Sequence, residues 1–481
     1  MSPPTLGPDI SQSPTLPPIA RPPIVPLKRG SLSSGTSRSF ESSHGSISPV
    51  ISISRSSSTS SILFLDGEPE VVTEDGVDHI SKRLHTKRYK TPAFAEDLLQ
   101  LIFALGVPSW SVATGVVSSE LIRVQKVSGS LTNAVFFVSY PSLPAVKTIL
   151  LRIYGASSSS LISRPRELHT LHILSSQHRI GPRVYGTFEN GRLEEYFPSQ
   201  ALTPADLRDP TISGWIGARM AELHCVDIEA VEQTTPSTRG ENVGWEIGAR
   251  KNIRLWLKPA QEVLALPGLK AETRATLDLN RFVVEWEAYM RWLTEWESIH
   301  GPSKRVFAHN DTQYGNLLKL NNVKEGVPAH RQIIVVDFEY AGPNSAAFDI
   351  ANHFHEWTAN YHSRQPHILD PTRYPNETER RNFYRSYLAN ACPPFATTTC
   401  ANPSNENIDA EAEIQRIDEQ VKAWSPASHA MWAVWGIVQA REDIEAIQPN
   451  GTAAEEPEFD YIGYATYRIA AFRREISALG L

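Results

Sequence analysis

The spacing of apolar residues predicts a helix and then several strands in the first ordered part of the chain. Apolar side chains recur at helical spacing at four positions, Phe94, Leu98, Leu101 and Leu105. Thr91 and Pro92 are a typical N-cap and first-turn proline for this helix. Runs rich in β-branched residues then predict three strands, Leu121–Val127, Ala134–Tyr140 and Thr148–Tyr154. A helix over Pro165–Arg179 and a hairpin turning at Asn190-Gly191 follow.

Beyond residue 198 the pattern becomes mainly helical. Helical spacing of apolar residues predicts helices at 210–228, 246–264, 272–299, 346–362, 376–389, 408–423, 426–448 and 458–478. A strand-rich interval covers 305–339, and the Pro- and Asn-rich stretch 391–406 is typical of a loop. The chain therefore divides into a small β-rich lobe and a larger helical lobe, an α+β arrangement.

Composition separates the start of the chain from the rest. Residues 1–65 are dominated by proline and serine, so they bury too little apolar surface to offset their ordering entropy and are predicted to be a disordered tail. We interpret 66–90 as a basic linker, in which the charges of 82–90 form a solvated face. We assign 91–200 to the N-lobe and 201–481 to the C-lobe.

Charge, sorting signals and cysteines limit the functional class. Lys plus Arg is 46 and Asp plus Glu is 53, a formal net charge of −7, which argues against a nucleic-acid partner. The chain shows no signal peptide and no run of about 20 apolar residues, so we expect a cytoplasmic protein without stable membrane insertion. Cys225, Cys392 and Cys400 lack metal spacing, which argues against a disulfide scaffold and favours a reducing compartment.

The richest chemistry lies in the strand-rich interval. Asp311 and Asn316 stand five residues apart on a predicted loop, and Asp337 follows the apolar run 333–336. Phosphoryl transfer from ATP uses one carboxylate to accept the proton of the attacking hydroxyl, and an amide oxygen and a second carboxylate to hold Mg²⁺. The spacing matches the catalytic loop and the Asp-Phe-Gly position of protein kinases. We therefore predict a two-lobed protein-kinase-like fold with Asp311, Asn316 and Asp337 as its catalytic residues.

Each piece of this motif also has a structural alternative. Asp311 could cap a turn, and Asp337 could end a strand with a satisfied hydrogen bond. Both motifs in this order, after a β-rich lobe, favour the catalytic interpretation. An ordinary protein kinase fits less well, because Gln313 stands where a lysine is usual and Glu339 replaces the final glycine.

Longer stretches of the chain closely resemble the choline/ethanolamine kinases. These stretches are His309–Asn316, Val336–Tyr340 continuing to Glu356-Trp357, Leu151–Gly155, Gly191–Tyr196 and Trp432–Trp435. The resemblance extends from about residue 80 to the C-terminus, and the Ser-rich leader is similar to that of fungal members. It implies an ATP- and Mg²⁺-dependent enzyme that converts choline to phosphocholine, the first step of the CDP-choline route to phosphatidylcholine. A homodimer is a further expectation.

The resemblance implies roles for residues around ATP and Mg²⁺. Asp311 would be the catalytic base, and Asn316 and Asp337 would bind the metal. A hairpin over the phosphates would contain Gly129, Ser130, Leu131, Thr132 and Asn133, with Ser130 in place of the family's usual second glycine.

Further nucleotide contacts would come from the N-lobe and the segment joining the lobes. Arg152 would contact phosphate and form an ion pair with Glu167 from the small-lobe helix. Gln313 would also contact the nucleotide. The hinge against adenine would cover Glu195 to Ala201, with Glu195, Tyr196 and Phe197 as its binding residues.

The alcohol site follows from the chemistry of choline. A quaternary ammonium has no N–H donors, so it is recognised by aromatic faces and a nearby carboxylate. The C-terminal half supplies Tyr340, Glu356, Trp357, Tyr361, Trp432, Trp435, Tyr461 and Tyr464. Aromatic residues at helical spacing are usually core residues, but these positions match the family's choline pocket. Among them we predict a cage of Tyr340, Glu356, Trp432, Trp435 and Tyr464.

Other functions remain as alternatives. An ethanolamine kinase, or an enzyme with dual specificity, would have the same fold and catalytic loop. An aminoglycoside-type phosphotransferase would need an acidic pocket, and an inactive scaffold would not need the intact catalytic set. We expect His309 to brace the catalytic loop, and we expect no metal pair at His353 and His355 because residues two apart on a helix point apart.

Overall fold

The computed structural model describes most of the chain in seven stretches. They are residues 71–127, 133–154, 163–232, 245–322, 325–392, 403–447 and 459–481. All of them belong to one compact unit, residues 49–481. The predicted tail, 1–65, and positions 129–132 of the predicted phosphate-covering hairpin lie outside the described residues.

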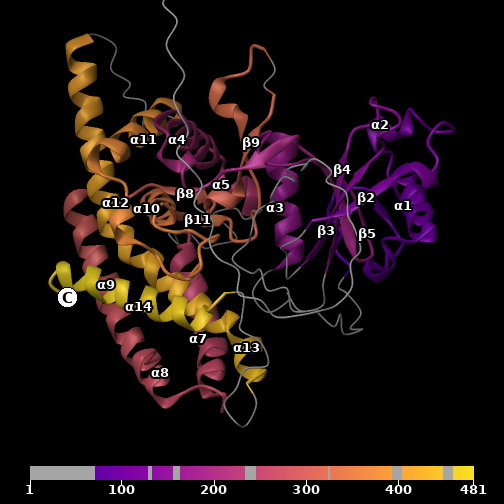
Figure 1. The fold of residues 1–481 in the computed structure, drawn as a ribbon. Coiled ribbons are helices and arrows are strands. Elements are labelled where there is room, and N and C mark those ends of the chain that lie inside the picture. The colour runs from indigo at the N-terminus through magenta and orange to yellow at the C-terminus, as the bar shows by residue number, and fades with distance from the viewer. Residues whose placement is uncertain are drawn as a thin grey trace, which may run out of the picture. The chain divides into compact units, whose positions relative to one another are not determined.

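A six-stranded sheet forms the first part of this unit (Figure 1). Its strands lie in the order β1-β5-β6-β4-β3-β2, and each pairing is antiparallel except that of β1 with β5. The bounds are β1 His79–Ile80, β2 Arg123–Lys126, β3 Asn133–Ser139, β4 Ile149–Tyr154, β5 Val184–Phe188 and β6 Gly191–Glu195. The predicted strands and the hairpin at Asn190-Gly191 are therefore confirmed.

Helices cover both faces of the sheet (Figure 1). On one face α1, Pro92–Ala104, shares a buried cluster with alternate residues of the strands, including Leu151. On the other face α3, Arg164–Gln177, lies near Arg152, because successive strand residues point to opposite faces. The side chain of Thr91 caps α1 by accepting a hydrogen bond from Phe94 N at 3.3 Å, as predicted.

Part of the predicted linker belongs to the folded unit. His79 and Ile80 form β1 and pair with β5. Leu84 is only 2% exposed and lies in the same buried cluster as α1, whereas most of the charged residues around it are exposed. The folded part thus begins before residue 91, because a few apolar side chains are enough to anchor a basic stretch.

A short helix, α2, Pro108–Ser111, follows α1 and completes the first part of the unit. The second part of the unit is helical. Its helices are α4 Pro210–His224, α5 Ile228–Glu232, α7 Gly248–Ala265, α8 Ala271–Thr276, α9 Leu279–His300, α10 Ala346–Glu356, α11 Glu377–Asn390, α12 Pro403–Gln439, α13 Arg441–Glu445 and α14 Tyr461–Ala478. Two small sheets accompany them. One has the order β10-β9-β7, built from Ile333–Val335, Leu317–Leu320 and Ser199–Ala201, and the other pairs β8, Arg305–Ala308, with β11, Gly342–Ser345.

Several helix boundaries differ from those predicted. The predicted break before Pro426 is wrong, because α12 continues through it and begins inside the predicted loop 391–406. Burial of the apolar residues that follow Pro426 offsets its missing hydrogen bond, which costs about 3 kcal/mol. The predicted helix 272–299 is divided, since Asp278 caps α9 by accepting from two backbone N–H groups. The predicted helix 346–362 ends at Glu356.

A disulfide joins Cys225, just after α4, to Cys392, just after α11. No local pattern indicates this bond, because the two cysteines are 167 residues apart. The sequence predicts a reducing compartment and no disulfide scaffold, and the bond between Cys225 and Cys392 departs from that expectation.

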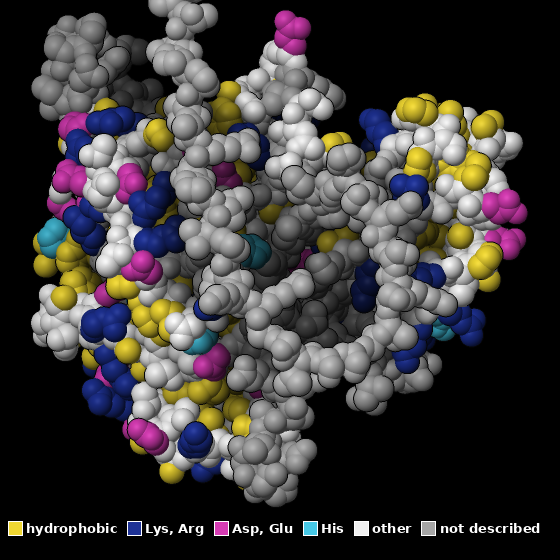
Figure 2. Space-filling view, in the orientation of Figure 1, with side chains coloured by type: hydrophobic (Ala, Val, Ile, Leu, Met, Phe, Trp, Pro, Cys, Tyr) yellow, Lys and Arg dark blue, Asp and Glu magenta, His cyan; other side chains and the backbone are white. Residues whose placement is uncertain are grey.

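Two further features of the molecule are the distribution of surface charge and the apolar character of the helices. On the face shown in Figure 2, Lys and Arg side chains are interspersed with Asp and Glu over the helical part. Among the helices that the structure describes, none combines the length and apolar character needed to cross a bilayer.

Candidate active site

The loop after β8 is held by one buried carboxylate from α10. Asp349 Oδ1 accepts from Asn310 N at 2.8 Å, and its Oδ2 accepts from His309 N at 2.9 Å and from His224 Nε2 at 3.0 Å. Burial opposes ionisation of Asp349, but the hydrogen bond from His224 and the neighbouring groups outweigh it and lower the pKa. The loop is therefore fixed at its backbone, immediately before Asp311.

Within this loop Asp311 and Asn316 converge, as their spacing predicts. Asn316 Nδ2 donates to the backbone oxygen of Asp311 at 2.9 Å and to its Oδ2 at 3.1 Å. His309 braces the same loop, because its Nε2 donates to Val336 O at 3.0 Å and its Nδ1 accepts from Asp311 N at 3.3 Å. The structural role predicted for His309 is confirmed, and burial lowers the pKa of its imidazole.

Asp337 follows β10 and approaches the same region. Its φ is +69°, in the left-handed region that non-glycine residues rarely adopt. Burial raises the pKa of Asp337 to about 6, although Arg152 acts in the opposite direction. Burial, followed by the charge of Asp337, also raises the pKa of Glu339 well above its ordinary value. The carboxylates are thus gathered closely enough to repel one another, which favours a cation between them.

The donor set suits Mg²⁺. Asn316 Oδ1 is buried and has no hydrogen-bond partner among the described residues, while its Nδ2 is fixed by Asp311. Mg²⁺ prefers oxygen ligands, usually carboxylates together with substrate phosphates. The Asn316 amide oxygen and the Asp337 carboxylate therefore fit the metal that the sequence implies.

A cavity lies between the sheet and the catalytic segment. It is lined by Leu150, Arg152, Glu167, Leu171, Pro182, Arg192, Glu194, Glu195, Tyr196, Phe197, Ser199, Ala201, Leu318, Val336, Asp337 and Phe338. The three predicted binding residues of the hinge, Glu195, Tyr196 and Phe197, belong to this lining, as do Arg152 and Glu167. Apolar side chains and Asp337 line the same cavity. This combination suits a nucleotide, whose adenine ring is apolar and whose phosphates are charged.

One predicted ion pair is wrong. Glu167 Oε1 accepts from Arg192 Nη2 at 2.5 Å, whereas Arg152 Nε donates to Glu194 Oε1 at 3.0 Å. Arg192 Nε donates to the same oxygen of Glu194 at 2.6 Å. The register of β4 with β6 places Arg152 opposite Arg192, which therefore takes the position that the sequence assigned to Arg152.

In this buried network of four residues, the charges of the two arginines are balanced by those of the two glutamates. Burial raises the pKa of Glu167 and of Glu194, but the arginines outweigh it, and both carboxyl groups have a lowered pKa. Arg192 and Glu194 were not identified from the sequence as site residues. Their alternation on one strand was the signal that could have indicated them.

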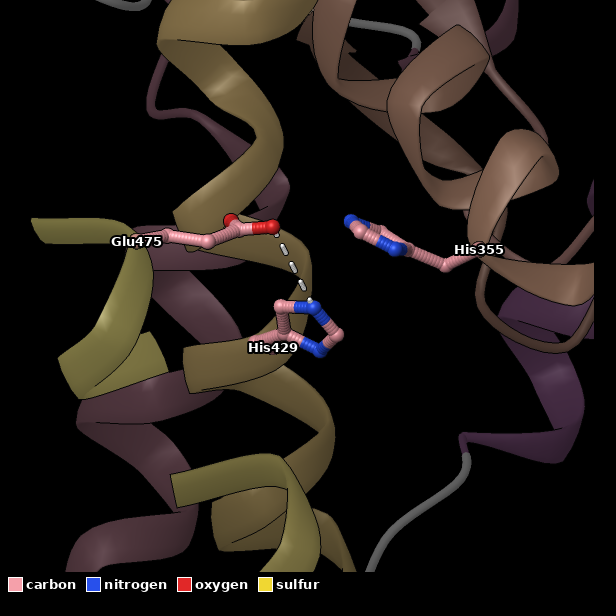
Figure 3. A group of neighbouring side chains, drawn as sticks. All are labelled: His355, His429 and Glu475. Carbon is pink, nitrogen blue, oxygen red and sulfur yellow. Dashed lines mark ion pairs between the residues drawn. The ribbon is translucent and has the colours of Figure 1, made fainter. Parts of the chain in front are cut away.

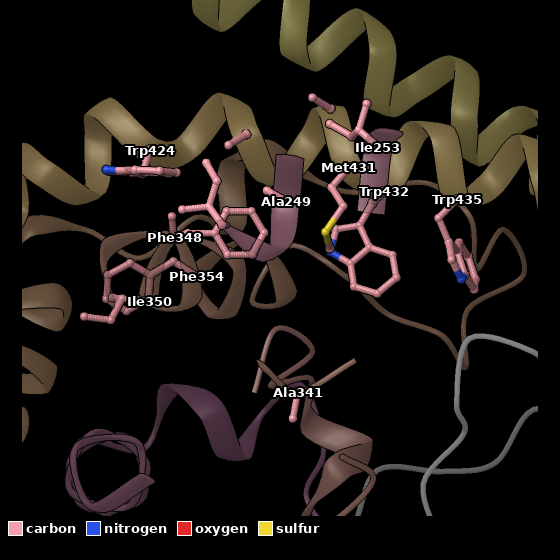
Figure 4. Close-up of a cluster of buried hydrophobic side chains, with 14 of the residues drawn as sticks. Ala249, Ile253, Ala341, Phe348, Ile350, Phe354, Trp424, Met431, Trp432 and Trp435 are labelled. Carbon is pink, nitrogen blue, oxygen red and sulfur yellow. The ribbon is translucent and has the colours of Figure 1, made fainter. Parts of the chain in front are cut away.

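The predicted aromatic residues form a continuous group of rings. Ring centroids are 5.4 Å apart for Tyr340 and Trp432, 5.3 Å for Trp432 and Trp435, and 5.7 and 6.1 Å from Trp435 to Tyr461 and Tyr464. Trp432 and Trp435 project from the same side of α12 (Figure 4). Trp432 and Tyr464 are 0% exposed, and Trp435 is 1% exposed. The rings are therefore closed off from solvent, and Tyr340 is the one half-buried member of the group.

The ring group is tied to the catalytic loop. Trp432 Nε1 donates to Asn352 Oδ1 at 2.7 Å, and Asn352 Nδ2 donates to Asn310 O at 3.1 Å. Asn310 Nδ2 donates to Tyr340 O at 2.9 Å. Asn352 was not identified as a site residue from the sequence, where it is one of several polar residues in α10.

The remaining predicted residues are divided. Tyr361 OH donates to Glu356 Oε2 at 2.6 Å, which brings this pair together as predicted. Trp357 lies elsewhere, with its ring near Phe354 and Arg208. Gln313 is fully buried beside Asp311. Asn133 begins β3, next to the undescribed hairpin residues.

The two histidines of α10 point apart, as expected. His353 Nδ1 donates to Thr312 O at 2.8 Å, and its Nε2 accepts from Trp357 Nε1 at 3.3 Å. His355 instead contacts Ser425 on α12.

The chain is similar in sequence and in fold to known proteins. The sequence profile described as "Choline/ethanolamine kinase" matches residues 124–473. The choline kinase of Schizosaccharomyces pombe is 34% identical over 81% of this chain and 90% of that protein. The ethanolamine kinase of Saccharomyces cerevisiae is 28% identical over 81% of this chain and 77% of its own. The crystal structure of choline kinase from Cryptosporidium parvum matches with a TM-score of 0.59 and 23% identity, over 80% of this chain and 96% of that one, and shows the fold alone.

Proposed function

The chain belongs to the choline/ethanolamine kinase family, and we propose that it transfers the γ-phosphoryl group of ATP to the hydroxyl group of choline. The products are phosphocholine and ADP. The observation that carries the proposal is the direct connection between the two halves of the site. Asn310 and Asn352 link the segment holding Asp311 to Tyr340 and Trp432.

Asp311 is the base in this proposal. Its carboxylate accepts the proton of the choline hydroxyl as the oxygen attacks the γ-phosphorus, and the bond to the bridging oxygen of ADP breaks. Because Asn316 donates to Oδ2 of Asp311, that carboxylate is held in one orientation. His309 and Asp349 fix the backbone on which it stands.

Asn316 and Asp337 would hold Mg²⁺. When bound, Mg²⁺ supplies positive charge that neutralises the charge developing on the phosphates. The positive φ of Asp337 is in keeping with a role that requires a particular side-chain direction. The network of Arg152 and Arg192 with Glu194 and Glu167 fixes Arg152 in the lining of the cavity, where it would contact a phosphate group.

The ring group favours choline as the acceptor. Faces of tryptophan and tyrosine attract a methylated cation and offer it no hydrogen-bond acceptors, which it does not need. Tyr340, Trp432 and Trp435 stand next to the catalytic segment, so a cation among them would present its hydroxyl group toward Asp311. Cytoplasmic location and a homodimer remain predictions from the sequence.

The test is a comparison of two alcohols with one purified protein. With Mg-ATP and either choline or ethanolamine at equal concentration, we expect a higher kcat/KM for choline. A higher kcat/KM for ethanolamine would reverse the proposed substrate. Absence of ADP formation with both alcohols, in a protein that unfolds cooperatively, would contradict the proposed activity altogether.

A further inference from the structure

A buried arginine lies next to the carboxylate assigned to the ammonium group. Arg468 on α14 and Glu356 at the end of α10 are both 0% exposed, and Arg468 Nη2 lies 3.4 Å from Glu356 Oε1. Tyr361 OH donates to the other oxygen, Oε2, at 2.6 Å. Both oxygens of Glu356 therefore already have a donor within the protein.

Two other contacts hold the guanidinium in place. Arg468 Nε donates to Tyr464 OH at 3.0 Å, and Nη1 donates to His429 Nδ1 at 3.0 Å. The central carbon of the guanidinium lies 5.1 Å from the centroid of the Tyr464 ring. Since the arginine fork is planar and rigid, three acceptors on different elements fix both its position and its orientation.

His429 acts here as an acceptor for Arg468. It belongs to a group with His355 and Glu475 that has the composition of a metal site (Figure 3). However, the Nδ1 lone pair of His429 is used by Arg468, so the neutral ring carries its proton on Nε2, 3.6 Å from Glu475 Oε1. Burial and the charges of Arg468 and Arg474 keep the pKa of His429 well below its ordinary value, which preserves the neutral ring. A metal ion would need the Nε2 lone pair that this arrangement removes.

We propose that Arg468, together with Tyr361, makes the alcohol site selective for a quaternary ammonium over a primary ammonium. This inference rests on the proposed function of the site. A primary ammonium brings three N–H donors that need acceptors in a buried site, whereas a quaternary ammonium brings none. Because Arg468 and Tyr361 use the oxygens of Glu356, these oxygens are poorly placed to serve the three donors of ethanolamine.

The charge of Arg468 acts in the same direction. A primary ammonium is a compact, strongly hydrated charge, so it depends on a full countercharge to offset the loss of water. In the pair with Glu356, the guanidinium already offsets that countercharge. The charge of choline is covered by methyl groups and is bound by the faces of Trp432 and Trp435, which Arg468 leaves unchanged.

The experiment measures kcat/KM for choline and for ethanolamine in Arg468→Met, which removes the charge and the donors but keeps an apolar side chain of similar length. We expect the choline-to-ethanolamine ratio to fall about tenfold or more, mainly through a higher value for ethanolamine, with KM for ATP unchanged. The control is Arg291→Met on α9, where the side chain is exposed and the ratio should stay at the wild-type value. An unchanged ratio in folded Arg468→Met would overturn the inference.

Two further variants keep the test decisive if Arg468→Met fails to fold. Arg468→Lys preserves the charge and should keep the ratio near the wild-type value, and a fall of about tenfold there would count against the role of the charge. Tyr361→Phe releases the other oxygen of Glu356 and should lower the ratio without affecting KM for ATP, and an unchanged ratio there would count against the inference. Failure of the proposed function is distinguishable, because it is seen in the wild-type protein, which would then phosphorylate neither alcohol.

Discussion

The catalytic loop and the ring group differ in how they are held. The loop carries Asp311 on a backbone that donates hydrogen bonds to the side chains of Asp349 and His309 and accepts one from Asn316. The ring group is held mainly by packing of large side chains. In addition, the indole N–H of Trp432 donates a hydrogen bond to Asn352, and that of Trp435 donates one to Tyr340. The comparison teaches that a polar site is specified by individual donors and acceptors, and an apolar site by shape. Substitutions should therefore alter kcat in the first region and KM for the alcohol in the second.

The largest effect is expected at Asp311. Asp311→Asn keeps the size of the side chain but removes the base, so kcat should fall by about 10²- to 10⁴-fold. Binding of ADP, measured by calorimetry, should change little because the nucleotide cavity is lined by other residues. A kcat near that of the wild type would show that another group accepts the proton. The control is Asp209→Asn, which alters only the exposed cap of α4.

Asp349→Asn on α10 should be the substitution that most destabilises the catalytic loop. The amide has only one acceptor oxygen for the backbone N–H groups of His309 and Asn310 and for His224, so a buried donor loses its partner. We expect a loss of about 3 kcal/mol in the free energy of unfolding, measured in urea, together with a lower kcat. A variant with wild-type stability would mean that the loop does not depend on this carboxylate.

Trp432→Leu tests the ring group, where we expect a change in KM for the alcohol. It keeps apolar bulk but removes the ring face, and a desolvated cation–π contact is worth about 2 kcal/mol, so KM for choline should rise by about tenfold or more. KM for ATP should remain within about twofold. The matched control is Trp286→Leu, a buried tryptophan on α9, which should lower stability without a change in KM. Equal increases of both KM values in Trp432→Leu would contradict the assignment.

The smallest effect concerns pH. Burial lowers the pKa of His353 to about 4, whereas an unfolded histidine titrates near 6.5. The unfolded state therefore binds more protons between these values, and stability is lost as pH falls from about 6.5 toward 4. We expect His353 to contribute about 1 kcal/mol of this loss at pH 5.5. In urea unfolding, His353→Asn, which can still donate to Thr312 O, should lose less stability than the wild type between pH 7.5 and 5.5, and an equal loss would refute the assignment.

Sequence reasoning was most successful where neighbours in the chain determine geometry. Asp311 and Asn316 converge because they lie on one short loop. Thr91 caps α1 by accepting a hydrogen bond from Phe94 N in the first turn of that helix. Contacts between distant elements were harder to predict. The partner of Glu167 depends on the register that places Arg152 opposite Arg192, and no local spacing encodes this register.

The same distinction applies to Asp349, Asn352 and Arg468. Each is an ordinary polar residue in a helical pattern, and its importance comes from the surfaces that meet around it in the fold. The continuous α12 is a related case, because burial of a long apolar face outweighs the local signal of Pro426. Burial and contacts between distant elements are therefore what could not be predicted from local sequence patterns.

The central claim is that the alcohol binds among the rings and directly beside the catalytic loop. Choline can be titrated by calorimetry into Asp311→Asn protein saturated with Mg-ADP, with and without the additional change Trp432→Leu. We expect saturable binding at one site, weakened about tenfold or more by the second substitution. Equal affinity in the two proteins would contradict the claim, because the cation would then bind away from the rings.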